Sequence, residues 1–135
     1  PWPAPFGEAA QILSRLVNAG LACMAERPCA DIAFNEVMVQ RYPPSPCGIS
    51  PHRDHIRYTG LIGILVVDGA GAFHICDDRG GNNARPIPAP PGSFLLMRAP
   101  GFDGSHDRPF HTLGAVTQTR LIAGYRQDTR PGEPD

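Results

Sequence analysis

The sequence of 135 residues has no long hydrophobic run, no lysine, no paired cysteine motif and almost no net charge. Its longest apolar stretches fall far short of the ~20 residues with which a helix crosses a bilayer, so we expect no association with a membrane. The four cysteines form no C-x-x-C pair, and their spacing suits neither a zinc knuckle nor a disulfide framework. A net charge of −1 provides no overall basic field that would attract nucleic acid. All 12 basic residues are arginine, which we interpret as a bias of composition.

The length is sufficient for one hydrophobic core, and we expect a single domain over residues 1–135. The first residues carry no basic stretch followed by an apolar run, which is the pattern of a secretory signal. We therefore expect a cytoplasmic protein. The oligomeric state is not indicated by the sequence.

One helix is predicted at the start of the chain. Over residues 7–26, apolar side chains recur at steps of three and four residues, which predicts a helix that covers one face of a sheet. From Asn35 the period changes to two, and this predicts a strand that ends at Tyr42, before a proline-rich segment.

Further short strands are predicted along the rest of the chain. We expect them over residues 48–54, 61–67, 93–97, 110–116 and 120–126. Residues 68–71 are expected to form a hairpin turn, with a return strand over residues 72–76. Seven or eight short strands after one helix predict a mainly β fold, a double-stranded β-helix (jelly roll, cupin-like) with its core over residues 34–127.

The stretch Gly48-Ile49-Ser50-Pro51-His52-Arg53-Asp54 contains the strongest chemical signal. If it forms a strand, His52 and Asp54 lie on one face and Arg53 on the other. One imidazole and one carboxylate on the same face can bind a divalent metal from two sides. Two nitrogens and one carboxylate oxygen, with open positions left over, form the ligand set of non-haem Fe(II) oxygenases.

Four other histidines compete for the third ligand position. His55 points away from His52 on an unbroken strand, and His74 is expected to be a wall or core residue of the hairpin. His106 lies in a loop, whereas His111 lies in a late strand that a jelly roll places beside an early one. We therefore favour His111 over His106 as the third ligand.

Two arginines six residues apart form a companion signal. Arg120 and Arg126 project to the same face of a regular strand. Two guanidiniums in one barrel are costly unless they meet anions, and each can bind a carboxylate through two hydrogen bonds. A dicarboxylic acid that chelates the metal at one end and meets arginine at the other satisfies both features. Alternatively, both arginines lie at the surface of an edge strand.

These motifs together resemble the Fe(II)/2-oxoglutarate-dependent dioxygenases, and among them the AlkB-like group. The likeness covers roughly residues 34–127. It rests on Phe34-Asn35 before a strand that ends in Gln40-Arg41-Tyr42, on the H-x-D motif, on Pro91-Gly92-Ser93 before an apolar strand, and on a late histidine followed by R-x5-R.

The resemblance implies a role for each matching residue. It implies iron binding by His52, Asp54 and His111. It implies that Arg120 binds the distal carboxylate of 2-oxoglutarate with the help of Tyr42, and that Arg126 and Gln40 also face this co-substrate. The implied cofactors and co-substrates are Fe(II), 2-oxoglutarate and O2, with ascorbate as a reductant.

The sequence departs from the AlkB-like pattern at several points. Gln40 stands in place of the group's asparagine, and Ile122 replaces the asparagine two residues after the first arginine. The short distance from histidine to arginine is closer to the prolyl-hydroxylase-like dioxygenases. The 33 residues before the barrel leave little room for the lid with which the DNA-repair members recognise a nucleotide.

Three functions follow as hypotheses. The first is an oxygenase of an alkylated nucleobase or another N-methyl substrate, with Arg57, Tyr58 and Phe73 as candidates for the rim of its site. The second is an oxygenase of a small molecule or a protein side chain. The third is a cupin-like metal protein that holds Zn(II) or Mn(II) and uses no 2-oxoglutarate, which leaves the paired arginines without a task.

Overall fold

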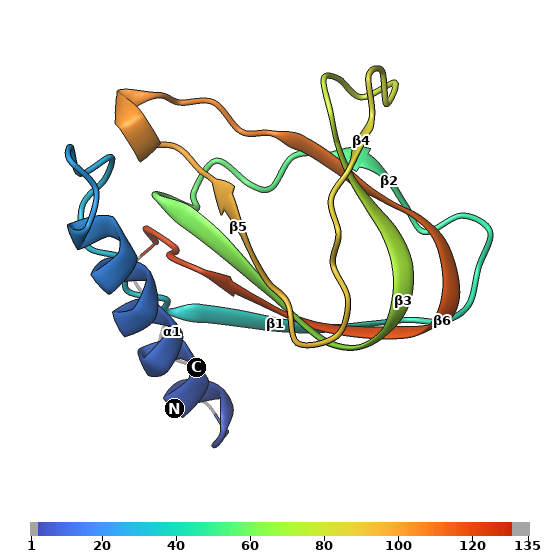
Figure 1. Cartoon of the computed structure of the whole chain (residues 1–135), viewed down its shortest axis with the longest axis horizontal. Helices are drawn as coiled ribbons and strands as arrows, with labels where there is room; N and C mark the ends of the chain where they lie inside the picture. Colours follow the sequence, from blue (N-terminus) through green and yellow to red (C-terminus); the bar gives the residue numbers. More distant parts are fainter. Residues whose placement is uncertain (1–2, 131–135) are drawn as a thin grey trace.

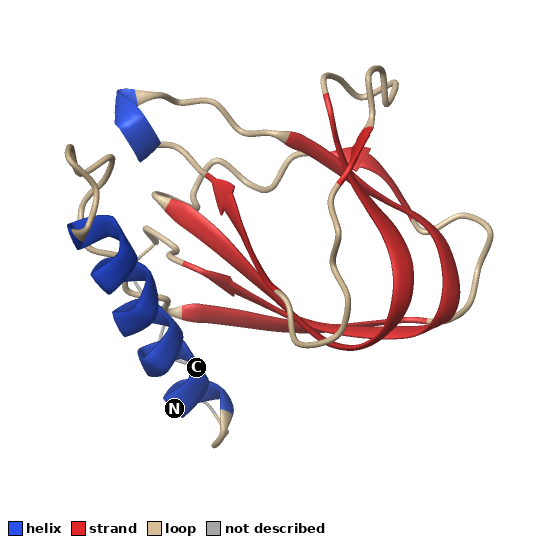
Figure 2. Ribbon diagram, viewed as in Figure 1, coloured by secondary structure: helices blue, strands red, loops and turns tan. Residues whose placement is uncertain are grey.

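A computed structural model of the chain describes residues 3–130, and it is a mainly β structure with one helix (Figures 1 and 2). The elements follow in the order α1 (Phe6–Ala22), β1 (Glu36–Tyr42), β2 (Ile49–His52), β3 (Leu61–Cys76), β4 (Arg85–Pro86), β5 (Phe94–Arg98), the 3-10 helix η1 (Phe102–Gly104) and β6 (Phe110–Arg126). In the described part of the chain, no helix is both long and apolar enough to cross a membrane.

Two long antiparallel strands, β3 and β6, connect the two halves of the sheet. At one end, β1 pairs with residues 120–126 of β6, and β5 pairs with residues 61–65 of β3. At the other end, β2 pairs with β6 near His111, and β4 pairs with β3 at His74 and Ile75. Figure 1 shows that β3 and β6 curve together between the two halves. The expected jelly roll is confirmed, with a half β1-β6-β3-β5 facing a half β2-β6-β3-β4.

The predicted hairpin at residues 61–76 is wrong, because β3 continues through the expected turn. Residues 68–71 remain beside β6, and the register shifts repeatedly between Val66 and Phe73. Such bulges insert residues without ending the ladder and increase the local bend. Gly69 has a φ of 85° and meets the backbone of Thr119 closely, so the turn residues bend the strand instead of reversing it.

The two predicted closing strands are also one element. Residues 117–119 do not end β6, because Gln118 and Val116 pair with Ala70 and Gly71 across the bend. The described residues therefore form six strands where seven or eight short ones were expected, since two of the strands are long.

The helix is shorter than the predicted 7–26 and ends at Ala22. Its last turn is closed by bonds from the N–H of Cys23 to Gly20 and from the N–H of Met24 to Leu21, the tighter pattern of a 3-10 turn. The helix covers one face of the sheet, as predicted. One cluster of buried residues joins it to the sheet, and it consists of Ala10, Val17, Leu21, Ile32, Phe34, Leu61, Ala123 and Tyr125.

A second cluster fills the space between the two halves of the sheet. It consists of Tyr58, Ile62, Ile64, Val66, Phe73, Met97, Ala99, Leu113, Val116 and Ile122. Several of these side chains also border the cavity described next, so this core forms the inner wall of the candidate site.

Candidate active site

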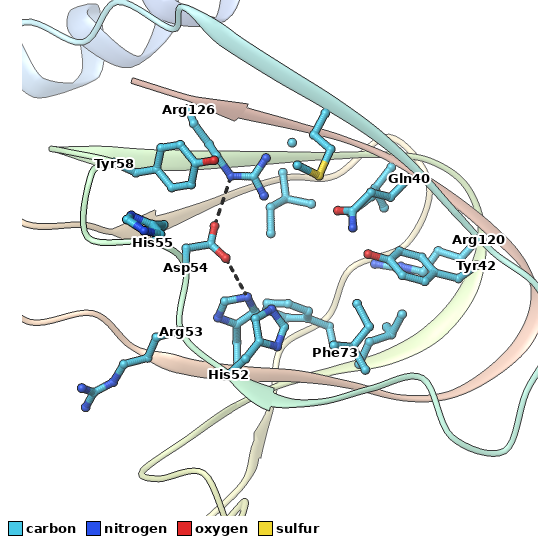
Figure 3. A pocket seen from close by; sticks show the side chains of 17 residues that line it. Gln40, Tyr42, His52, Arg53, Asp54, His55, Tyr58, Phe73, Arg120 and Arg126 are labelled. Carbon is cyan, nitrogen blue, oxygen red and sulfur yellow. Dashed lines mark hydrogen bonds and ion pairs between the residues drawn. The ribbon is translucent and has the colours of Figure 1, made fainter. Parts of the chain in front are cut away.

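Three potential metal ligands meet where β2 pairs with β6. His52 lies opposite His111 in the register of the two strands, and the ring centroids are 4.3 Å apart. β2 ends at His52, so Asp54 lies beyond the strand and not on it as expected. Its side chain nevertheless lies beside that of His52 (Figure 3), and one potential ligand atom from each of His52, Asp54 and His111 lies within 4.8 Å of the others. Among residues 3–130, no other group of histidine, cysteine and acidic side chains meets in this way.

The remaining histidines lie elsewhere. His55 borders the cavity but does not belong to this group. His74 is on β3, and its Nδ1 lies 3.1 Å from the carbonyl oxygen of Ala72. His106 lies in the loop before β6 and borders a separate depression beside Cys29.

The two imidazoles of the group share an orientation. The Nδ1 of His52 lies 2.8 Å from the carbonyl oxygen of Ser50, and the Nδ1 of His111 lies 3.3 Å from that of Pro109. A carbonyl only accepts hydrogen bonds, so these contacts assign the proton to Nδ1 and leave Nε2 with a lone pair. Such a backbone contact fixes the tautomer of a metal-binding histidine.

Burial keeps His111 neutral. Desolvation lowers its pKa from the ordinary value, and this effect exceeds the opposing attraction of Asp54, whose Oδ1 lies 3.6 Å from Nε2 of His111. The neighbouring ring of His52 lowers the same pKa further. A neutral imidazole is the form that binds a metal.

A cavity of about 300 Å³ extends from this group between the two halves of the sheet. Its walls come from alternate residues of β1 and β6, among them Met38, Gln40, Tyr42, Arg120, Ile122 and Arg126. Sequence reasoning missed Met38, although the two-residue period that placed Gln40 and Tyr42 on one face also includes it.

Arg126 lies at the metal end of this cavity. Its Nε donates a hydrogen bond of 3.3 Å to Oδ2 of Asp54, while its buried Nη1 has no partner among the described residues. Gly124 makes room for it, because a Cβ at that position would lie 2.9 Å from Nη1. The N–H groups of Nη1 are therefore left for a further acceptor.

Arg120 lies at the end of the cavity away from His52 and His111, and it lacks an acidic partner in the described part of the chain. Its side chain is buried, and Nη1 donates a bond of 3.2 Å to the carbonyl oxygen of Ala89. Within residues 3–130, no carboxylate lies within 4.0 Å of it. Desolvation lowers its pKa, and burial raises the pKa of the neighbouring Tyr42 hydroxyl. A buried cation with one neutral acceptor is an unsatisfied site for an anion.

The donor set thus fits a metal and a dicarboxylate. Two imidazole nitrogens and one carboxylate suit a divalent transition metal with open positions. The Nη1 of Arg126, which has no partner among the described residues, and the buried guanidinium of Arg120 belong to residues that line the same cavity.

Of the three residues considered for the rim, Tyr58 and Phe73 line the cavity, whereas Arg57 does not. Tyr58 and Phe73 are buried, and Phe73 packs against His111 with ring centroids 5.9 Å apart. Arg57 forms an ion pair of 3.0 Å with Asp128. One further contact carried no sequence signal: Nη1 of Arg108 donates a 2.8 Å bond to the backbone oxygen of Asp54.

Neither the protein-family models nor the curated proteins contain a match to the sequence. Two solved structures share its architecture. OsALKBH1 aligns over 93% of this chain with a TM-score of 0.67 and 16% identity, and a prolyl-4-hydroxylase from Pseudomonas putida aligns over 99% with a TM-score of 0.58 and 17% identity. This chain has their fold. It spans 64% of the length of OsALKBH1 and 73% of the length of the hydroxylase.

Proposed function

We propose that the protein is an Fe(II)- and 2-oxoglutarate-dependent dioxygenase. One observation supports this most directly: a two-histidine, one-carboxylate group borders the same cavity as Arg120, a buried arginine with no acidic partner within residues 3–130. The fold is consistent with it, since both neighbours, an AlkB homologue and a prolyl-4-hydroxylase, are dioxygenases of this class. These are also the two groups that the sequence motifs resemble.

In this proposal, His52, Asp54 and His111 hold the iron. Arg120 binds the distal carboxylate of 2-oxoglutarate, with the Tyr42 hydroxyl beside it. Gln40 and Arg126 face the rest of the co-substrate.

When bound, the iron and 2-oxoglutarate supply the oxidation of a C–H bond by O2, with release of succinate and CO2. The chain's own residues orient these groups and limit access of water. Arg126 holds the carboxylate of Asp54, and Ile64, Leu113 and Ile122 form an apolar wall of the cavity.

The oxidation leads to hydroxylation, or to demethylation where the carbon is attached to nitrogen. An alkylated nucleobase is one candidate substrate. A small molecule or a protein side chain is a second, and one observation favours it: the large apolar side chains exposed between residues 3 and 130 are aliphatic or methionine, with no aromatic ring among them. Proteins that take up an unstacked base usually stack it on aromatic side chains.

The test is succinate formation from 2-oxoglutarate with Fe(II), ascorbate and O2, without added substrate. We expect slow turnover by the wild type and none by the His52→Ala and Arg120→Ala variants. His74→Ala and Arg85→Ala are matched controls, because these residues lie outside the cavity, and both should retain turnover. A wild type that binds metal but neither binds nor consumes 2-oxoglutarate would contradict the proposal and favour the cupin-like metal protein.

A further inference from the structure

Tyr58 borders the cavity, and its hydroxyl forms hydrogen bonds with charged side chains. Its side chain is buried, and its hydroxyl donates a 2.6 Å hydrogen bond to Oε1 of Glu36. The same hydroxyl accepts a 2.7 Å bond from Nη2 of Arg57. The hydroxyl thus donates one hydrogen bond and accepts another, and these bonds hold the outer end of the ring in place.

A cluster of ion pairs surrounds this hydroxyl. Arg57 contacts Asp128 through Nε at 3.0 Å and Glu36 through Nη2 at 3.7 Å. Arg130 contacts Asp128 at 2.7 Å. The cluster joins the first residue of β1, the segment after Asp54 and the segment after β6. Three parts of the chain therefore meet at Tyr58.

The ring of Tyr58 faces the guanidinium of Arg126 (Figure 3), with 5.2 Å between the ring centroid and Cζ. This distance is within the range of a cation–π contact. Nε of Arg126 in turn donates to the carboxylate of Asp54 at 3.3 Å. A continuous chain of contacts therefore runs from the Glu36 carboxylate through Tyr58 and Arg126 to a potential metal ligand.

Asp54 depends on such support more than the two histidines do. His52 and His111 lie in paired strands, whereas Asp54 follows the last residue of β2. Its backbone is held by Arg108, but that contact leaves the rotation of the carboxylate free. The hydrogen bond from Arg126 orients the carboxylate of Asp54, and the contact with the ring of Tyr58 holds Arg126 in position.

We propose that Tyr58 is a positioning residue for the metal site, and that it acts by holding Arg126 against Asp54. This inference rests on the proposed function, which identifies the site as a metal site. Its test measures metal binding and does not require the oxygenase activity. A ligand held loosely costs metal affinity, and outer residues that orient ligands commonly contribute 10- to 100-fold. Tyr58 stands one contact further out, so we expect about a 3-fold loss for Tyr58→Phe and about 10-fold for Tyr58→Leu.

The experiment is a calorimetric titration of the full chain with Mn(II), without 2-oxoglutarate and below the unfolding temperature. The variants are Tyr58→Phe and Tyr58→Leu, each in the wild-type and the Arg126→Ala backgrounds. Tyr125→Phe is the matched control, because Tyr125 is buried on the same strand as Arg126 but outside the cavity. If Tyr58 acts through Arg126, its substitution weakens Mn(II) binding in the wild type and changes it less than 2-fold in Arg126→Ala.

Equal losses in both backgrounds, or unchanged Mn(II) affinity in both Tyr58 variants, would overturn the inference. Should Tyr58→Leu not fold, Tyr58→Phe alone decides the outcome, since it keeps the ring. A wild type that binds Mn(II) but forms no succinate would refute the proposed function and leave this test intact. A wild type that binds no divalent metal would overturn both.

Discussion

The two ends of β6 differ in the charge that they bring to one cavity. At the first end, His111 is buried as a neutral imidazole beside His52 and Asp54. At the second, Arg120 and Arg126 are buried as guanidiniums, and within residues 3–130 they have one carboxylate partner between them. The first end suits a cation and the second an anion. A single strand thus provides opposite preferences a short distance apart, which is what a metal chelated by an acid requires.

The bend between these ends separates the two chemistries. It lies where β3 bulges past β6, and glycine allows the close approach: a Cβ at Gly69 would lie 2.0 Å from the carbonyl oxygen of Thr119. If the bend were lost, the imidazole and the guanidiniums would no longer face the same space. The following changes test the two ends and the bend, in order of decreasing expected effect.

The largest effect is expected from His111→Ala, which removes one of the three proposed metal ligands. We expect Mn(II) affinity to fall on the order of 100-fold or more, because one of the two coordinating imidazole nitrogens is lost. Calorimetry with Mn(II) measures this, with His74→Ala as the control on β3. An unchanged Mn(II) affinity in His111→Ala would show that His111 does not bind the metal.

Gly69→Ala should break the bend itself. The added methyl group meets backbone atoms, and the φ of 85° is strained for alanine, so we expect a loss of about 3 kcal/mol in the free energy of unfolding in urea. Gly92→Ala is the matched control: its φ is 86°, but no atom lies within 4 Å of the added Cβ. It should lose only about 1 kcal/mol, from strain alone. Equal losses would mean that close packing at the bend is unimportant.

Arg120→Lys changes the end of β6 that suits an anion and leaves the end with His111 unaltered. It keeps the charge but loses the planar fork, so we expect 2-oxoglutarate to bind about 10-fold more weakly and Mn(II) to bind unchanged. Equilibrium titration with each ligand separates the two effects. Arg85→Lys, at an exposed arginine, should change neither affinity. A parallel loss of Mn(II) affinity would show that the ends are not independent.

The smallest effect is expected on the pH dependence of stability, through Asp128 in the segment after β6. The Arg130 guanidinium holds the pKa of Asp128 below its usual range. A lowered pKa means that this contribution to stability is present above the unfolded value of about 3.9 and is lost as the pH falls through the lower folded value. We therefore expect Asp128→Asn to be less stable than the wild type at pH 7, and the difference to shrink below about pH 4. Thermal unfolding at both pH values checks this, and a difference independent of pH would contradict it.

Much of the site could be predicted because it depends on local spacing. Gln40 and Tyr42 share a face with a period of two, and Arg120 and Arg126 do so over six residues, so each pair could be assigned to one wall. His111 could be favoured because a jelly roll returns a late strand to an early one.

The remainder depends on contacts between distant segments. The Asp-Gly sequence at residues 68–69 is typical of a hairpin turn, but pairing with β6 on one side keeps β3 extended through it. Asp54 was expected on a strand, yet β2 ends two residues earlier and the carboxylate reaches the site from a loop. The contact of Tyr58 with Glu36 spans 22 residues and carries no periodic signal.

The position of Asp54 beyond the β ladder also has a consequence for native-state fluctuations. Segments without ladder hydrogen bonds open at lower free energy than the strands that flank them, so amide exchange should be faster at residues 53–57 than along β6. A ligand that binds only the closed form slows such opening in proportion to its saturation. The exchange rate of this loop would therefore report how much metal is bound.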